Sequence, residues 1–430
     1  MFTLKDFSVT RHEAKLTNGT RVVLFERPGT PVAISAAFIA GSRFDPPGKE
    51  GLAHFLEHML LAGTKNFPTK DKLAAYIEDL GGITSASTGH LALRVEVAVG
   101  DPIDVPSAIK VLSEEIINPL FNEKAIETER GAILRELASS KESPTKVLSR
   151  LAYRLIYQKT VEDHDTLGSE ESIKSITKDD ILNFYKEHLN ASSLAIVVSG
   201  GVDLAKLTEI LEKELPVASG SRPEFSANLP IFREKITDFS YFKGSNLNVE
   251  FDFRTVHHTH PDSRSLSILG SILGGGRTSA LAKKLRYEKG LVYGVSARNG
   301  GFIDGGDFGI STHASKDNLQ EVMDIIVTEL KRMKDTGPTA EELQLVKNRL
   351  IKSKKMSMQT SGSWVDWHEY RTLYYPDSVW TIEDYFKEVS SVTSEEVREV
   401  ASKYLTNNNW YLTITGDVDE AFLQSIKISL

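Results

Sequence analysis

Apolar and polar residues alternate along several short segments of the chain, and helical spacing follows them. Segments 21–25, 32–40 and 93–99 have the pattern of strands, and later segments carry apolar residues three and four positions apart. The second half begins likewise, with an alternating segment at 247–253 and a helix-like segment from Pro261. This order predicts an α+β fold in which helices are packed on largely antiparallel sheets.

The pattern also repeats along the chain. The segment that begins at Ile176 aligns without a gap with the segment that begins at Val392, and Thr177 then matches Thr393. Both copies have the pattern of a capped helix, a polar turn, an apolar strand and a Gly-x-Val-Asp exit. Because the shift is half the chain, we predict two homologous domains in tandem.

A change of composition marks the junction between the two copies. Residues 216–230 hold prolines, serines and a glycine in place of a periodic apolar pattern. We therefore predict an N-terminal domain at 1–215, a linker at 216–230 and a homologous C-terminal domain at 231–430.

Composition excludes several classes of protein. The 430 residues include no cysteine, so disulfides, thiolate metal ligands and a cysteine nucleophile are excluded. The net charge of −8, with scattered Lys and Arg, offers no basic surface for nucleic acid. We find no apolar run that could span a bilayer and no targeting segment at the N-terminus, so we expect a cytoplasmic protein without membrane contact.

Two histidines mark a candidate metal site. The segment 51–63 follows a Pro-Pro-Gly break and has no internal helix breaker, so it is predicted to be a helix. His54 and His58 lie one turn apart and point to one side of that helix, with Glu57 beside them. H-x-x-E-H is the inverted zincin motif, in which the glutamate takes a proton from the attacking water.

A catalytic zinc ion usually has three protein ligands, so a further side chain is required. The helix-like segment 121–140 offers several glutamates. Glu129 and Glu136 are seven residues apart and share a helix face, whereas Glu127 lies on the opposite side from Glu136. Glu129 and Glu136 are therefore the two candidates.

With these residues in view, the chain resembles the inverted-zincin peptidases, the family of pitrilysin, insulin-degrading enzyme and the mitochondrial processing peptidase. Segments 41–64 and 127–136 carry the resemblance, which extends over nearly the whole chain. It implies a processing-peptidase-like fold and a zinc-dependent endopeptidase with one Zn²⁺ per chain. The implied roles are His54, His58 and Glu136 as zinc ligands, Glu57 as general base and Glu129 as an assisting outer carboxylate.

A second family block is matched by segment 274–297. The resemblance implies that Tyr293 donates a hydrogen bond to the developing oxyanion and that Arg286 holds carbonyls of the substrate. Gly290 is expected to end a helix, so that Tyr293 begins the next strand. The segment 274–279, GGGRTS, lacks the lysine and the strand context of a phosphate-binding loop.

The resemblance also implies how substrate is bound. Ser85 and Ala86 fall on the strand that lies beside the substrate, where backbone groups pair with an extended peptide. Family chambers contain four such domains, so a homodimer that encloses short or unfolded peptides is expected. The alternative is a noncatalytic structural or assembly subunit of the same fold; the presence of the metal residues together with Arg286 and Tyr293 favours the peptidase.

Overall fold

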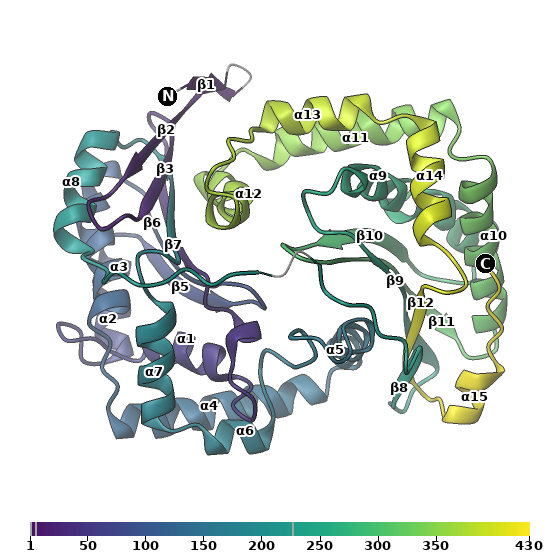
Figure 1. The fold of residues 1–430 in the computed structure, drawn as a ribbon, viewed down its shortest axis with the longest axis horizontal. Coiled ribbons are helices and arrows are strands. Elements are labelled where there is room, and N and C mark those ends of the chain that lie inside the picture. Colours follow the sequence, from purple (N-terminus) through teal and green to yellow (C-terminus); the bar gives the residue numbers. More distant parts are fainter. Residues whose placement is uncertain (1, 5–6, 226–227) are drawn as a thin grey trace. The chain divides into compact units, whose positions relative to one another are not determined.

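The chain forms two compact units, each a sheet covered by helices (Figure 1). The computed structural model describes residues 2–4, 7–225 and 228–430. The first unit comprises Met1–Leu137, His164–Glu224 and Lys355–Thr381; the second comprises Ala138–Asp163, Phe225–Lys354 and Ile382–Leu430. The predicted α+β fold with two sheets is confirmed.

The sheet of the first unit has the strand order β1-β2-β3-β7-β4-β6-β5. Its neighbouring strands are antiparallel except for β3 and β7. The strands are β1 Phe2–Leu4, β2 Val9–Lys15, β3 Arg21–Glu26, β4 Val32–Phe38, β5 Ile83–Thr88, β6 Leu93–Val99 and β7 Leu194–Gly200. Strand β5 lies at the sheet edge and, among the described strands, pairs only with β6.

Helices of the first unit bury apolar faces in one core with this sheet. Alternating residues of β6 from Leu93 to Val99 are buried in it, as the period-two pattern predicts. The helices are α1 Leu52–Leu61, α2 Lys70–Asp79, α3 Val105–Ile117, α4 Glu123–Lys141, α6 Glu170–Ser175, α7 Lys178–His188, α8 Leu204–Glu214 and α12 Ser361–Tyr374, with short 3₁₀ turns at Ser42–Phe44 and Pro102–Asp104.

The second unit has a five-stranded sheet in the order β10-β11-β9-β12-β8, in which only the β12–β8 pair is parallel. The strands are β8 Thr237–Tyr241, β9 Asn246–Thr255, β10 Val295–Gly301, β11 Gly306–Ser315 and β12 Trp410–Gly416. The helices are α5 Pro144–Ile156, α9 Asp262–Gly274, the π-helix η4 Ala282–Glu288, α10 Leu319–Asp335, α11 Ala340–Ser357, α13 Ile382–Ser391, α14 Ser394–Tyr404 and α15 Glu420–Ser425.

The predicted repeat is present in the structure. Thr177 precedes α7 and Thr393 precedes α14, and each forms a capping box with the residue three positions on, Asp180 or Glu396. In both units an apolar strand follows, β7 in the first and β12 in the second. The same local signals therefore produce the same helix and strand in the two halves.

The compact units exchange one helix each way. Helix α5 comes from the first half of the sequence but packs against β8, β9 and β12 of the second unit. Helix α12 comes from the second half but packs on β4 and β7 of the first unit, where buried Glu369 accepts a hydrogen bond from Ser35 and pairs with Arg94. The ranges 1–215 and 231–430 stay a prediction for the repeats, because the compact units are not continuous in sequence: the chain passes from the first unit to the second at 137–138, 224–225 and 381–382.

Within the described residues, none of the helices combines the length and the apolar character that crossing a bilayer would require.

A buried carboxyl group lies beneath the edge strand β5. Glu115 of α3 is fully buried, and the hydroxyl of Thr84 on β5 donates to it at 2.9 Å. Burial raises the pKa of Glu115 to about 8, and the hydrogen bond from Thr84 opposes this only in part. The folded protein therefore holds a proton on Glu115 at neutral pH.

We expect Glu115→Gln to reduce the pH dependence of stability. Between the ordinary value of 4.5 and about 8, the folded state binds a proton that the unfolded state releases, so stability falls as pH rises through this window. The slope is at most about 1.4 kcal/mol per pH unit. Glutamine keeps an acceptor for Thr84 and does not titrate.

Chemical denaturation at pH 5, 6, 7 and 8 measures this effect. The exposed Glu78 of α2 serves as the control, and Glu78→Gln should follow the wild-type protein. A Glu115→Gln variant whose stability falls with pH as steeply as that of the wild type would contradict the assignment.

Candidate metal centre

Helix α1 begins at a sharply defined point. Gly51, which precedes it, has φ +93°, and a Cβ at this position would lie 2.9 Å from the carbonyl oxygen of Leu167. Asp45 accepts hydrogen bonds from the backbone N–H groups of Gly51 at 2.7 Å and Ala53 at 2.8 Å. These bonds satisfy free donors of the first turn and fix the direction in which α1 leaves the loop.

The two histidines of α1 converge as the spacing predicts. The ring centroids of His54 and His58 lie 4.8 Å apart, and donor atoms of both rings and of Glu57 lie within 4.8 Å of one another. Burial lowers the pKa of His54. The neutral imidazole, which is the form that binds a metal, is therefore favoured.

Helix α4 adds a third donor to the two imidazoles. Oε2 of Glu136 lies 3.7 Å from Nε2 of His54 and 3.7 Å from Nε2 of His58. Two ligand atoms at about 2.1 Å from a tetrahedral ion are roughly 3.4 Å apart, so these separations fit a single zinc ion. Imidazole nitrogen and carboxylate oxygen are also the donors that zinc accepts in a chain without cysteine.

Glu129 contacts the other side of the His58 ring. Its Oε2 lies 2.8 Å from Nδ1 of His58, and this hydrogen bond lowers the pKa of Glu129. An ionised carboxylate at Nδ1 holds the ring proton there and leaves the Nε2 lone pair directed toward Glu136. The two candidates from the sequence thus take different positions: Glu136 faces both histidines, and Glu129 supports one of them.

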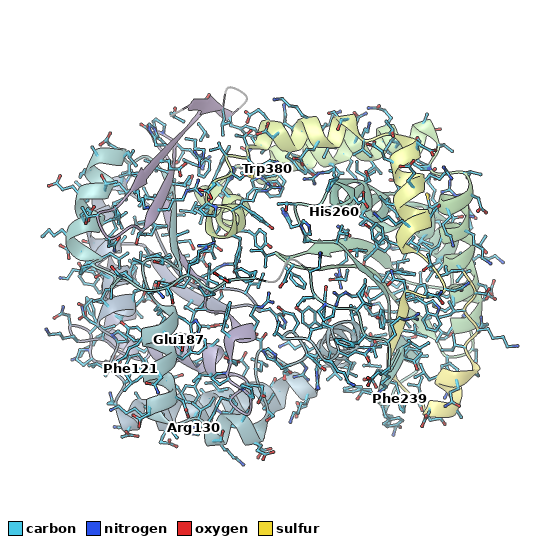
Figure 2. All side chains as sticks on the ribbon, viewed as in Figure 1. Phe121, Arg130, Glu187, Phe239, His260 and Trp380 are labelled. Atoms are coloured by element: carbon cyan, nitrogen blue, oxygen red, sulfur yellow. The ribbon has the colours of Figure 1, made fainter. Side chains whose placement is uncertain are left out.

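Arg130, labelled in Figure 2, lies on α4 and makes the contacts that hold this helix against α1. Its guanidinium lies over the ring of Phe55 at 5.2 Å, donates to the carbonyl of Ile176 at 2.9 Å, and pairs with Glu127 at 3.1 Å. A single side chain therefore holds α4 to the metal helix and to the segment between α6 and α7. The structure pairs Glu127 with this arginine, consistent with its expected place on another face.

The edge strand β5 lies beside α1. It carries Ser85, which is exposed, and Ala86, which is half-buried. Its outer edge is not paired within the described part of the chain, so its backbone groups are able to pair with an extended peptide.

Arg286 and Tyr293 meet in the second unit. The guanidinium of Arg286 lies 4.8 Å from the ring centroid of Tyr293 and 5.4 Å from that of Tyr287. Tyr293 is 83% exposed. Gly290 has φ +66° and follows the π-helix, as predicted for a helix end. The prediction that Tyr293 begins the next strand is wrong, because the ladder to β11 starts at Val295.

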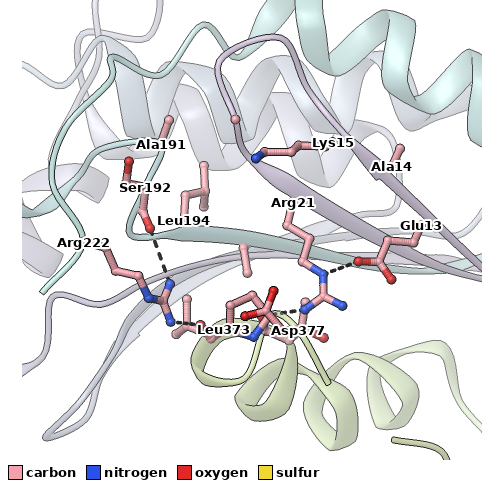
Figure 3. Close-up of a pocket in the computed structure, with 14 residues that line it drawn as sticks. Glu13, Ala14, Lys15, Arg21, Ala191, Ser192, Leu194, Arg222, Leu373 and Asp377 are labelled. Carbon is pink, nitrogen blue, oxygen red and sulfur yellow. Dashed lines mark hydrogen bonds and ion pairs between the residues drawn. The ribbon is translucent and has the colours of Figure 1, made fainter. Parts of the chain in front are cut away.

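A cavity of about 660 Å³ in the first unit contains none of the predicted site residues (Figure 3). Arg222 donates to the carbonyl of Leu373 at 2.5 Å, and Arg21 donates to that of Thr372 at 3.4 Å. These carbonyls end α12, so the two arginines stabilise its C-terminus. The cavity thus lies at the seam between α12 and the sheet. Sequence reasoning missed both arginines, since their partners on α12 lie 351 residues from Arg21 and 151 residues from Arg222 along the chain.

Comparison with known proteins matches both halves of the chain to models of one peptidase family. Residues 21–169 match the sequence model described as Insulinase (Peptidase family M16), and residues 175–350 match that described as Peptidase M16 inactive domain. An uncharacterized zinc protease of Rickettsia felis is 26% identical over 410 residues, which cover 92% of this chain and 95% of the relative. The mitochondrial-processing peptidase subunit beta of Bos taurus is 26% identical over 94% of this chain and 84% of its own.

The fold is shared with solved structures. The structure of a protease from Helicobacter pylori superimposes with a TM-score of 0.85 at 19% identity, over 95% of this chain and 99% of that one. Since consecutive parts of the sequence match two models of a single family, and the relatives align with more than nine-tenths of the chain, the chain belongs to peptidase family M16, the family of pitrilysin and the mitochondrial processing peptidase.

Proposed function

We propose that this chain is a zinc-dependent endopeptidase that hydrolyses short or unfolded peptides. The observation that carries the proposal is the position of Glu136 Oε2, 3.7 Å from Nε2 of both His54 and His58. The zinc proteases among the relatives support a metallopeptidase.

Three side chains from two helices supply the ligands in this proposal. Zinc held by His54, His58 and Glu136 would polarise the peptide carbonyl as a Lewis acid. Glu57 lies next to the ligands on the same helix face, where its carboxylate accepts the proton of the attacking water and later passes it to the leaving amine. Glu129 acts through His58, whose ring it orients.

Substrate is held by groups outside the ligand set. We assign the exposed edge of β5, at Ser85 and Ala86, to backbone pairing with an extended peptide. Arg286 holds substrate carbonyls, and the hydroxyl of Tyr293 donates to the developing oxyanion. Because Arg286 and the exposed Tyr293 belong to the second unit, we further propose a homodimer whose enclosed chamber brings metal sites and Arg–Tyr pairs together. The cytoplasmic location stays a prediction.

A noncatalytic assembly subunit is the alternative. The match of residues 175–350 to a domain described as inactive is compatible with either function, because the two histidines and the three glutamates of the proposed metal site precede that segment. Zinc content and peptide cleavage distinguish the two.

The first test of the peptidase is Glu57→Gln. Loss of the base should lower kcat by about 10²–10⁴-fold while zinc stays bound, because glutamine preserves the shape of the side chain but accepts no proton. Cleavage of a quenched peptide, with and without chelator, and elemental analysis for zinc measure the two quantities. A purified protein without stoichiometric zinc, whose Glu57→Gln variant matches the wild type, would favour the assembly subunit.

Glu129→Gln should weaken zinc binding by about 10–100-fold, because the amide no longer stabilises the Nδ1 proton of His58. Competition with a chromogenic chelator measures the affinity. Glu127→Gln is the matched control, since Glu127 is on the same helix and pairs with Arg130. Equal zinc affinities for the two variants would remove Glu129 from the site.

Tyr293→Phe should lower kcat by about 10²-fold with no change in zinc content, since the variant loses only a hydroxyl donor. Tyr287→Phe is the control: this tyrosine also lies beside Arg286 and is exposed. If Tyr293→Phe released zinc, or if both variants lost the same activity, the proposed role of Tyr293 would be wrong.

A further inference from the structure

A cavity of about 260 Å³ in the second unit has no role in the site described so far. It lies between the end of α9, the glycine segment that follows, the start of η4 and the first turns of α11. Its polar walls include Ser271, Ser279, Lys283, Thr339, Glu342 and Arg349.

Two cationic side chains line this cavity without a carboxylate partner. Arg349 of α11 donates to the carbonyl of Ser271 at 2.8 Å, and burial lowers its pKa. Within the described part of the chain, neither Arg349 nor Lys283 forms an ion pair. Glu342 lies in the same wall, but Arg332 binds it through two hydrogen bonds of 2.8 and 3.1 Å. The two free cations therefore favour an anionic ligand.

A buried hydroxyl adds a neutral donor. Ser279 is only 4% exposed, lines the cavity, and its hydroxyl has no hydrogen-bond partner among the described residues. Buried hydroxyl groups are nearly always paired, so this one requires an acceptor. An oxygen of an anion between Lys283 and Arg349 would provide it.

The glycine segment makes room for the guanidinium. A Cβ at Gly275 would lie 2.4 Å from Nη2 of Arg349, and one at Gly276 would lie 3.0 Å from Nη1. Gly276 also has φ +152°. A side chain at either position would displace the guanidinium from its present place, and a Cβ at Gly275 would also lie 2.6 Å from the carbonyl oxygen of Ser271. The glycines thus leave room for Arg349 at the cavity.

Helix η4 connects this cavity with one of the proposed substrate groups, because it carries both Lys283, which lines the cavity, and Arg286. Lys283 and Arg286 are three residues apart on the π-helix η4, a helix type found frequently at functional sites. An extended peptide advances about 3.3–3.6 Å per residue. A terminal carboxylate one or two residues beyond a carbonyl held by Arg286 is therefore within reach of Lys283.

We propose that this cavity binds the C-terminal carboxylate of the peptide substrate through Lys283, Arg349 and Ser279. The proposal rests on the proposed peptidase function and adds a preference for peptides with a free C-terminus near the bound segment. The ligand is a singly charged carboxylate instead of a phosphate dianion, because the exposed Glu341 shares the wall and repels a second negative charge.

The test uses the full-length Glu57→Gln protein, so that binding is measured without turnover. Calorimetry compares one peptide with a free C-terminal carboxylate and the same peptide with a C-terminal amide. We expect the acid to bind about tenfold more tightly, because two cations and a hydroxyl contact the charged group. Lys283→Met and Ser279→Ala, added singly, should each reduce this ratio to about three or less.

Lys331→Met is the matched control, because Lys331 is exposed on α10 and forms no ion pair in the described chain; the tenfold ratio should persist. Equal affinities for acid and amide in the Glu57→Gln protein would overturn the proposal. So would competition by inorganic phosphate that depends on Lys283 while both peptides bind alike, since the site would then hold a free oxyanion.

These outcomes are separate from those of the proposed function. If wild-type protein lacks zinc and cleaves nothing, yet the acid binds tenfold more tightly through Lys283, the peptidase fails and the carboxylate site stands. If zinc-dependent cleavage depends on Glu57 but acid and amide are cleaved with the same KM, only the carboxylate site fails.

Discussion

The contact between α1 and α4 is the constraint on which the proposed metal centre depends. Helix α1 by itself places two imidazoles and the carboxylate of Glu57 together, but the third ligand of the proposed set, Glu136, comes from α4. Here Arg130 lies on the ring of Phe55 and binds a carbonyl before α7, and this holds α4 with Glu129 and Glu136 toward the histidines. A small displacement of α4 would alter both carboxylate contacts together, because the two glutamates lie two turns apart on one helix.

The two glutamates also show how one helix face performs two tasks. Glu136 is half-exposed and reaches the Nε2 atoms of both rings, whereas Glu129 is more buried and reaches Nδ1 of one ring. The buried carboxylate holds a ring in orientation, and the exposed carboxylate retains freedom to adjust to an ion. Helix α4 thus carries one carboxylate, Glu129, that orients a histidine ring and another, Glu136, that is free to bind an ion.

Much of the candidate site could be predicted because its geometry is local. The four-residue spacing of His54 and His58 and the seven-residue spacing of Glu129 and Glu136 each follow from helix geometry alone. Which glutamate faces the metal position depends on how α4 packs on α1, and helical spacing does not contain that information. For the same reason Tyr293 was placed in a strand, although the ladder begins two residues later, at Val295.

The exchange of α5 and α12 lies beyond what periodicity can predict. An apolar stripe shows that a helix face is buried but does not show which sheet covers it. The apolar Trp364 of α12 is compatible with packing on either sheet. The exchange of α5 and α12 also determines whether the two halves of the sequence can be expressed as separate fragments. Expressing residues 1–215 alone would leave the sheet face under Trp364 and Glu369 uncovered, and the remaining fragment would lack α5. Each repeat therefore requires a helix from the other to complete its compact unit. If the chain were cleaved in the 216–230 segment, the two resulting chains would still depend on each other for α5 and α12.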